Sequence, residues 1–206
     1  MLKFIGTGSA FNSHKRGNSS AYFVKRNVLY LLDCGLDTFE KLKGTKLIQS
    51  VSKVVVFITH LHVDHVGSLP SLIHYCKCIL KDKKIYVAYP VGDSVEVHDY
   101  LRLTGIASDE YEYISLFSKP KVLIETLEDP IYLTELSDFA GIRVQAIKTD
   151  HYSAINSYGY LIFVFCNRKR EYDMMYYSGD SRDIPPNVLR LFKNNKGLHL
   201  YQDTSY

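Results

Sequence analysis

Apolar positions along the chain fall into short strand-like runs and into helix-like repeats. Runs of branched and aromatic residues bounded by Gly, Pro, Asn or Asp predict strands. Strands are expected on this basis at residues 2–5, 21–24, 28–32, 54–58, 85–88, 122–126, 142–147, 158–165, 174–177 and 198–202. Apolar residues at three- and four-residue spacing predict helices at 37–43, 69–80 and 188–193, and a helix-prone stretch covers 93–117 with a break near Gly105.

The order of these elements predicts a mixed α/β protein. Strands come in runs with helices between them, and this order differs from the strict strand–helix alternation of a doubly wound parallel sheet. The strand at 54–58 is continuously apolar and β-branched, which is typical of a strand buried on both faces. No repeat, low-complexity tract or linker divides the 206 residues, so we expect a single domain over residues 1–206.

The composition is that of an ordinary globular protein. Hydrophobic residues make up 46% and charged residues 23% of the chain, which excludes a disordered or fibrous protein. No apolar stretch approaches the roughly 18 residues of a membrane-spanning helix. The first residues lack the apolar segment and small-residue cleavage site of a signal peptide. We therefore expect a cytoplasmic protein that does not associate with a membrane.

Four sparsely spaced cysteines, at 34, 76, 78 and 166, do not form the pattern of a disulfide framework. Cys76 and Cys78, with His74 just before them, suggest zinc as an alternative. Zinc sites prefer two residues between paired cysteines, however, and helix positions two apart point to nearly opposite sides. We expect buried or half-buried thiols.

The charge distribution bears on the substrate. The net charge is +3, but residues 108–139 hold eight acids against two lysines, so the rest of the chain is mildly basic. A mildly basic body permits an anionic substrate, either a small molecule or a nucleotide-like compound. The acidic segment would repel a phosphate backbone, which argues against transfer RNA. The sequence leaves open whether the protein forms a homodimer.

The strongest chemical signal is the segment that runs from Thr59 to Gly67, T-H-L-H-V-D-H-V-G. It follows the buried strand and carries four residues with metal-binding side chains: His60, His62, Asp64 and His65. Extended geometry puts the first two imidazoles on the same side, and the turn towards Gly67 directs the other two residues to a second point. Three imidazoles and a carboxylate are typical ligands of zinc or another borderline divalent metal.

This segment resembles the signature of the metallo-β-lactamase superfamily. Four further motifs, in the same order, are similar to the ribonuclease Z-like branch: Gly6-Thr7-Gly8-Ser9-Ala10 with Asn18-Ser19-Ser20; Leu32-Asp33-Cys34-Gly35; His151 followed by Ser157-Tyr158-Gly159-Tyr160; and Ser178-Gly179-Asp180. The resemblance covers nearly the whole chain. It implies an αββα four-layer sandwich and a metal-dependent hydrolase.

The resemblance also implies a ligand set. By motif position, His60, His62 and His151 bind the first metal, Asp64 and His65 bind the second, and Asp180 bridges the two. The implied cofactor is Zn²⁺ at two sites, with Mn²⁺ or Fe²⁺ as alternatives. Two such ions share a hydroxide at neutral pH, and Asp64 or Asp180 serves as the catalytic proton acceptor. Asp33 is expected to support the histidine turn from behind.

The sequence departs from the branch near its end. The branch supplies one more histidine to the second metal, whereas His199 is the only histidine after Asp180 here. Gln202 and Asp203 occupy the segment where ribonuclease Z carries a His-Glu pair. We therefore expect a weaker second metal site, and we favour a truncated chain that lacks the last C-terminal elements over a protein without that ligand.

These observations lead to a preferred function and two alternatives. The preferred function is hydrolysis of a small or nucleotide-like phosphodiester. The first alternative is hydrolysis of a carboxylic ester, lactone or thioester by the same chemistry. The second is a non-catalytic metal-binding scaffold with an impaired second site. Hydrolysis of β-lactams is a weaker reading, because those enzymes usually lack the histidine that His65 supplies.

Overall fold

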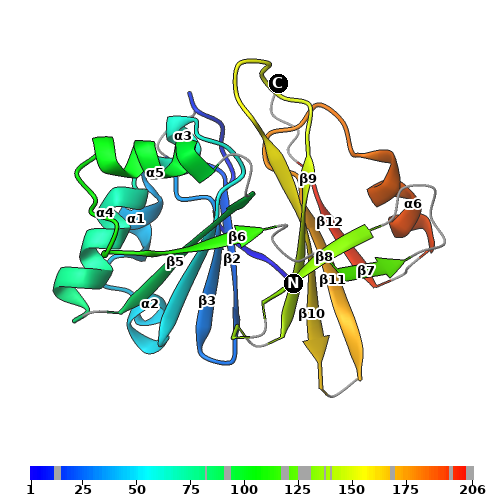
Figure 1. Ribbon diagram of the computed structural model, residues 1–206, viewed down its shortest axis with the longest axis horizontal. Coiled ribbons are helices and arrows are strands. Elements are labelled where there is room, and N and C mark those ends of the chain that lie inside the picture. Colours follow the sequence, from blue (N-terminus) through cyan, green and yellow to red (C-terminus); the bar gives the residue numbers. More distant parts are fainter. Residues whose placement is uncertain are drawn as a thin grey trace. The chain divides into compact units, whose positions relative to one another are not determined.

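The computed structural model describes residues 1–11, 15–81, 83–90, 94–116, 121–124, 131–136, 138–139, 141–167, 170–194 and 197–202, with only the backbone described at 121–124 and 131–132. The chain divides into two compact units, which we call the N-terminal unit (Leu2–Ser115) and the C-terminal unit (Leu116–Thr204). Each unit is built around one six-stranded sheet (Figure 1).

The N-terminal unit has its strands in chain order across the sheet. They are β1 (Lys3–Gly6), β2 (Ser20–Lys25), β3 (Val28–Leu32), β4 (Lys53–Phe57), β5 (Lys84–Pro90) and β6 (Glu112–Leu116). The first three pair antiparallel, whereas β3, β4 and β5 run parallel. All five residues of β3 are buried, as are the four that end β4. Because β3 and β4 are parallel, the residues that follow them meet at the same edge of the sheet.

Helices fill the connections of the N-terminal unit (Figure 1). They are α1 (Thr38–Leu42), α2 (Lys46–Ser50), α3 (Val63–Val66), α4 (Leu69–His74), the π-helix η1 (Tyr75–Ile79) and α5 (Ser94–Leu103). The apolar spacing of the α4–η1 segment buries Leu69, Leu72, Ile73 and Cys76. The short helix α3 carries Asp64 and His65 immediately after the β4 edge.

The C-terminal unit is a second, mainly antiparallel sheet. Its strands are β7 (Lys121–Ile124), β8 (Ile131–Leu136), β9 (Ile142–Lys148), β10 (Tyr158–Cys166), β11 (Glu171–Tyr177) and β12 (Leu198–Tyr201), in the spatial order β12-β11-β10-β9-β8-β7. Only β11 and β12 are described as a parallel pair, and the helix α6 (Pro186–Asn194) connects them. Val188 and Leu191 of α6 pack against the apolar side chains of Leu161, Phe163, Tyr176 and Leu198.

The structure confirms the predicted α/β class and most of its elements. The prediction of a helix-prone stretch at 93–117 was wrong at its end, because residues 112–116 form the strand β6 beside β5. Three described elements, α2, α3 and β8, were not predicted. Residues 125–126 of a predicted strand lie outside the described residues. A single domain over residues 1–206 stays a prediction. In the described part of the chain, no helix has both the length and the apolar character to cross a membrane.

Candidate metal centre

Asp33 and Thr59 meet at the edge of the N-terminal sheet where β3 and β4 end. The carboxylate of Asp33 accepts hydrogen bonds from the backbone N–H of Thr59 at 2.8 Å and from the Thr59 hydroxyl at 2.9 Å. Both residues are fully buried. The pKa of Asp33 is raised, because the effect of burial outweighs the lowering by His65 and by the hydrogen bonds from Thr59. A buried carboxylate therefore anchors the start of the histidine turn.

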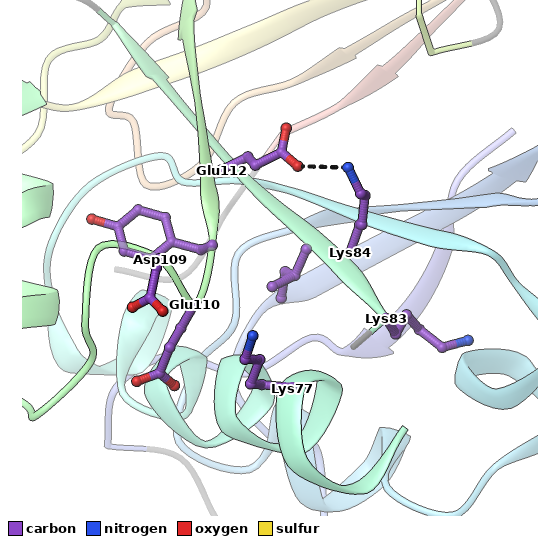
Figure 2. Close-up of a pocket in the computed structure, with 8 residues that line it drawn as sticks. Lys77, Lys83, Lys84, Asp109, Glu110 and Glu112 are labelled. Carbon is purple, nitrogen blue, oxygen red and sulfur yellow. Dashed lines mark hydrogen bonds and ion pairs between the residues drawn. The ribbon is translucent and has the colours of Figure 1, made fainter. Parts of the chain in front are cut away.

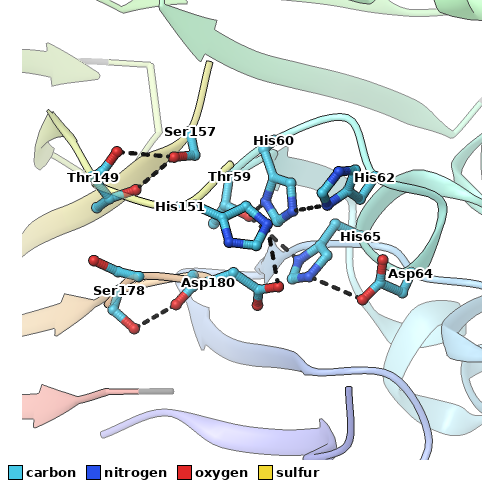
Figure 3. Close-up of polar contacts among 12 residues, drawn as sticks. Thr59, His60, His62, Asp64, His65, Thr149, His151, Ser157, Ser178 and Asp180 are labelled. Atoms are coloured by element: carbon cyan, nitrogen blue, oxygen red, sulfur yellow. Dashed lines mark hydrogen bonds and ion pairs between the residues drawn. The ribbon is translucent and has the colours of Figure 1, made fainter. Parts of the chain in front are cut away.

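This anchor orients two of the predicted ligands (Figure 3). The Nδ1 atom of His65 lies 2.9 Å from Asp33 Oδ2, and the Nδ1 atom of His60 lies 3.0 Å from the Thr59 hydroxyl. The single hydroxyl proton goes to the carboxylate, so the hydroxyl oxygen accepts from His60. Each imidazole then carries its proton on Nδ1, and each Nε2 keeps a lone pair for a metal ion.

His62 and Asp64 complete the group in the N-terminal unit. His62 Nδ1 lies 3.0 Å from His60 Nε2, and Asp64 Oδ2 lies 3.4 Å from His65 Nε2. Two imidazole nitrogens on one tetrahedral zinc ion, with Zn–N distances near 2.0–2.1 Å, are separated by roughly 3.3 Å. The facing nitrogens of His60 and His62 therefore already have a separation that suits a shared metal ion.

Backbone packing explains two further motif residues in this unit. Asp33 has a φ of 63°, a left-handed conformation that Asp tolerates better than most residues. Its carbonyl accepts the hydroxyl of Ser20 at 2.8 Å. A Cβ atom on Gly35 would overlap the carbonyl oxygen of Asp64, so only glycine allows this approach. The Asp-Cys-Gly motif thus packs directly against the backbone of the histidine turn.

The C-terminal unit carries the other predicted ligands on two turns at one sheet edge. The turn between β9 and β10 contains His151 and is closed by Thr149 and Ser157. The Thr149 hydroxyl donates to the Ser157 hydroxyl at 3.0 Å, and the Ser157 hydroxyl donates to the Thr149 carbonyl at 3.0 Å. The turn after β11 contains Asp180, and His151 Nε2 lies 3.7 Å from Asp180 Oδ2 (Figure 3). Within this unit, an imidazole and a carboxylate face each other as the ligand prediction requires.

The alternative zinc site at His74, Cys76 and Cys78 finds no support. Cys76 is buried and Cys78 is exposed, and the imidazole of His74 lies 2.7 Å from the Glu110 carboxylate. Burial raises the pKa of Cys34 and of Cys76 to about 12, so these thiols stay protonated at neutral pH. The predicted buried or half-buried thiols are confirmed except at the exposed Cys78.

The remaining histidines are not placed among the predicted ligands. His98 Nδ1 lies 2.5 Å from the hydroxyl of Tyr111, and His199 lies within β12. His14 lies outside the described part of the chain.

A hollow of about 180 Å³ in the N-terminal unit contains none of the predicted ligands (Figure 2). Its charged lining consists of three lysines and three acids, which balance each other: Lys77, Lys83, Lys84, Asp109, Glu110 and Glu112. Lys84 and Glu112 form an ion pair of 3.1 Å, and the Lys83 amino group donates to the Ile48 carbonyl at 2.8 Å. Because the charges of the lining balance and none of the predicted ligands is among them, we assign this hollow no role in the chemistry.

Comparison with known proteins places the chain in a family. A family model described as "Anti-Pycsar protein Apyc1" matches residues 1–206. The chain belongs to this family. Anti-Pycsar protein Apyc1 of Bacillus phage BSP38 is 27% identical over 183 residues, which cover 87% of this chain and 68% of that protein.

The chain is also similar to ribonuclease Z. Ribonuclease Z of Metallosphaera sedula is 32% identical over 161 residues, which cover 77% of this chain and 47% of that protein. Ribonuclease Z of Listeria monocytogenes is 29% identical, with 76% of this chain and 52% of that protein covered. The chain thus spans about half the length of these curated relatives. It is a ribonuclease Z-like member of the metallo-β-lactamase superfamily, as the motifs predicted.

Solved structures confirm the predicted metallo-β-lactamase fold. The human short-form tRNase Z matches with a TM-score of 0.57 and 24% identity, and the match covers 90% of this chain and 71% of that one. The metallo-β-lactamase fold protein YhfI of Bacillus subtilis matches with a TM-score of 0.62 and 16% identity, covering 92% and 66%.

Sequence reasoning identified Asp33 as a supporting residue, and the structure confirms its contact with His65. It did not assign a role to Thr59, whose hydroxyl connects Asp33 to His60, or to Gln202, whose amide contacts the turn after Asp180. Thr59 immediately precedes the first histidine, and a hydroxyl residue at a buried strand end is a detectable signal for such a role. The contact of Gln202 depends on strand register, which the sequence does not reveal.

Proposed function

We propose that this protein is a metal-dependent phosphodiesterase that acts on a small, nucleotide-like phosphodiester. The observation that carries this proposal is the histidine turn of the N-terminal unit. There, a buried Asp33–Thr59 pair fixes the proton of His60 and of His65 on Nδ1, so that each Nε2 atom can present its lone pair to a metal ion. The family match and the ribonuclease Z relatives support a phosphodiester substrate.

The proposed ligand assignment follows the motif order. His60, His62 and His151 would hold the first metal ion, Asp64 and His65 would hold the second, and Asp180 would be a ligand of both. The donor set fits the group, because neutral imidazole and carboxylate suit Zn²⁺ as well as Mn²⁺ or Fe²⁺. The second site has fewer protein ligands than the branch usually supplies, so we propose that it binds its ion more weakly.

The chain's own residues have separable roles in this chemistry. When bound, the metal ions supply Lewis acidity, which lowers the pKa of a water and stabilises charge on a phosphoryl oxygen. Asp64 or Asp180 accepts the proton of the attacking water. Asp33, through His65 directly and through Thr59 to His60, holds the imidazoles at fixed tautomer and orientation.

Three other readings lead to different outcomes in the same assay. The ribonuclease Z relatives make an RNA the competing phosphodiester substrate. Hydrolysis confined to lactones, thioesters or carboxylic esters would indicate the acyl-transfer alternative. Metal binding without turnover of any of these compounds would indicate a non-catalytic scaffold.

The test is hydrolysis of this panel by purified, metal-loaded protein and by Asp64→Ala. We expect turnover of bis-p-nitrophenyl phosphate and of a cyclic nucleotide, and a loss of at least 10²-fold in Asp64→Ala, because a ligand and proton acceptor is removed. The exposed acid Asp109 gives the matched control, Asp109→Ala, which should keep full activity. A folded Asp64→Ala variant with most of its activity would refute the proposed mechanism.

A further inference from the structure

The parallel pair β11–β12 brings two chain segments together beside Asp180. Tyr177 lies opposite Tyr201 in the register, so Ser178 and Gln202 are the first residues beyond the paired strands. Parallel strands end at the same edge of a sheet, and the backbone N–H of Ser178 accordingly donates to the Tyr201 carbonyl at 3.0 Å. Gln202 therefore leaves the sheet beside the turn that carries Asp180.

The side chain of Gln202 reaches across to that turn. Its Nε2 atom donates a hydrogen bond of 2.7 Å to the backbone carbonyl of Ser181. A carbonyl oxygen can only accept, so the amide nitrogen must face Ser181. In this orientation the Gln202 Oε1 atom is buried without a hydrogen-bond partner in the described part of the chain. An unsatisfied buried acceptor is unfavourable. The amide nevertheless keeps this orientation because the reversed amide would lose the hydrogen bond to the Ser181 carbonyl. The contact to Ser181 therefore determines how the side chain is placed.

The backbone is held by hydrogen bonds on both sides of Asp180. Ser178 is fixed to β12, Gly179 takes a left-handed φ of 57°, and the N–H of Arg182 donates to the Asp150 carbonyl at 2.9 Å. The residue after Asp180 is held at two points, because the Ser181 hydroxyl donates to the Asp183 carbonyl at 2.7 Å and the Gln202 amide contacts the Ser181 backbone. The Gln202 amide fixes the carbonyl of Ser181, which is only 4% exposed.

We propose that Gln202 is a positioning residue that holds the Asp180 carboxylate in its ligand geometry through the Ser181 carbonyl. This inference rests on the proposed function, in which Asp180 is a metal ligand. Gln202 itself touches neither substrate nor metal in this proposal. It acts on the turn, so its removal should alter how Asp180 binds a metal ion without removing any ligand.

The first test measures the turn in the metal-free protein. Gln202→Met removes the amide at nearly constant size, and Gln49→Met is the matched control because Gln49 also donates its amide to a backbone carbonyl, that of Gly44, at 3.4 Å. We expect about tenfold faster hydrogen exchange at the amides of Ser178 and Arg182 in Gln202→Met alone. Unchanged exchange at both amides would overturn the inference. Since no metal or substrate is present, this result does not depend on the proposed activity.

The second test separates positioning from a purely structural role. Co²⁺ replaces the native metal, and its visible absorption bands report ligand geometry. We expect altered bands in Gln202→Met and unchanged bands in Gln49→Met. Gln202→Asn, which keeps an amide on a shorter side chain, should lie between Gln202→Met and the wild type, and it replaces the Met variant if that one does not fold. Faster exchange with wild-type cobalt bands would refute positioning. A wild-type protein that binds no Co²⁺ would refute the proposed function, and the exchange result would still decide whether Gln202 holds the turn.

Discussion

The two units hold their predicted metal ligands by different physical means. In the N-terminal unit, side chains hold side chains, because the fully buried Asp33 carboxylate contacts His65 directly and reaches His60 through Thr59. In the C-terminal unit, His151 and Asp180 are each about a quarter exposed and sit on turns held mainly through backbone atoms. The first arrangement fixes the tautomer and the orientation of the ligands, whereas the described contacts around the second fix the path of the chain.

This difference predicts unequal sensitivity to substitution around the ligands. A buried carboxylate that sets the imidazole tautomers controls ligand strength directly, and such outer partners are typically worth 10–100-fold in metal affinity. Hydroxyls that close a turn act only through the turn, and each contributes roughly the 1 kcal/mol of an ordinary hydrogen bond. The N-terminal unit should therefore couple its packing tightly to metal binding, and the C-terminal unit should couple it loosely.

The largest expected effect comes from Asp33→Asn. The amide presents a donor where the Thr59 N–H, the Thr59 hydroxyl and His65 all donate, so at least one of these contacts is lost. We expect a 10–100-fold loss of zinc affinity, measured by competition with a chromogenic chelator. The counterpart in the C-terminal unit is Thr149→Val, which removes the hydrogen bond to the Ser157 hydroxyl.

Thr149→Val should leave zinc affinity within about threefold of the wild type, because the lost contact involves no ligand side chain and is worth only about 1 kcal/mol of stability. Thermal melts of both variants, run without metal, separate unfolding from a true change in affinity. Equal losses of zinc affinity in the two variants would mean that the two units do not differ in the way described here.

The sequence was sufficient to predict the candidate ligands of the histidine turn because their spacing is local. His60, His62, Asp64 and His65 lie within six positions after a strand whose apolar run is unmistakable. Their supporting contacts are long-range. Asp33 is 26 residues from Thr59, and Gln202 is 21 residues from Ser181. The Asp33 contact was anticipated from a family motif, while the Gln202 contact depends on the parallel register of β11 and β12.

The errors in the fold also have physical reasons. The residues of strand β6 were predicted to be part of a helix-prone stretch. They form a strand because Tyr113 and Ile114 favour strands and because pairing with β5 outweighs the local helix propensity. The helix α2 has only five residues and starts at Thr45, whose side chain accepts from the Ile48 N–H at 3.5 Å. Helices this short are stabilised by packing and capping, and they give little periodic signal.

Two glycines provide the next comparison. A Cβ atom on Gly35 would overlap the backbone carbonyl of Asp64, whereas a Cβ on Gly159 would lie 2.7 Å from the ring of the buried Tyr176. Both Ala variants should lose about 1–3 kcal/mol of unfolding free energy through overpacking, measured by urea denaturation. Only Gly35→Ala should also weaken zinc binding, because it displaces the histidine turn. Gly197→Ala meets no atom within 4 Å and serves as the control.

If Gly159→Ala reduced zinc affinity as much as Gly35→Ala, packing in the C-terminal sheet would be coupled to its ligands after all. Equal affinity in all three glycine variants would instead show that the Asp64 backbone tolerates displacement. The first result would mean that packing and metal binding are coupled in the C-terminal unit as well, and the second that they are coupled less tightly in the N-terminal unit.

The smallest effect concerns two tyrosine hydroxyls. The Tyr176 hydroxyl is buried without a hydrogen-bond partner in the part of the chain that the structure describes, and burial raises its pKa. The Tyr113 hydroxyl donates to the Tyr89 carbonyl at 2.9 Å. Tyr113→Phe should therefore cost about 1 kcal/mol. Tyr176→Phe should be neutral or stabilising by up to about 1 kcal/mol, because an unpaired hydroxyl is unfavourable in an apolar core. Urea denaturation of both variants measures the difference, and a loss above about 1 kcal/mol in Tyr176→Phe would show that this hydroxyl has a partner, such as a buried water, that stabilises the C-terminal core.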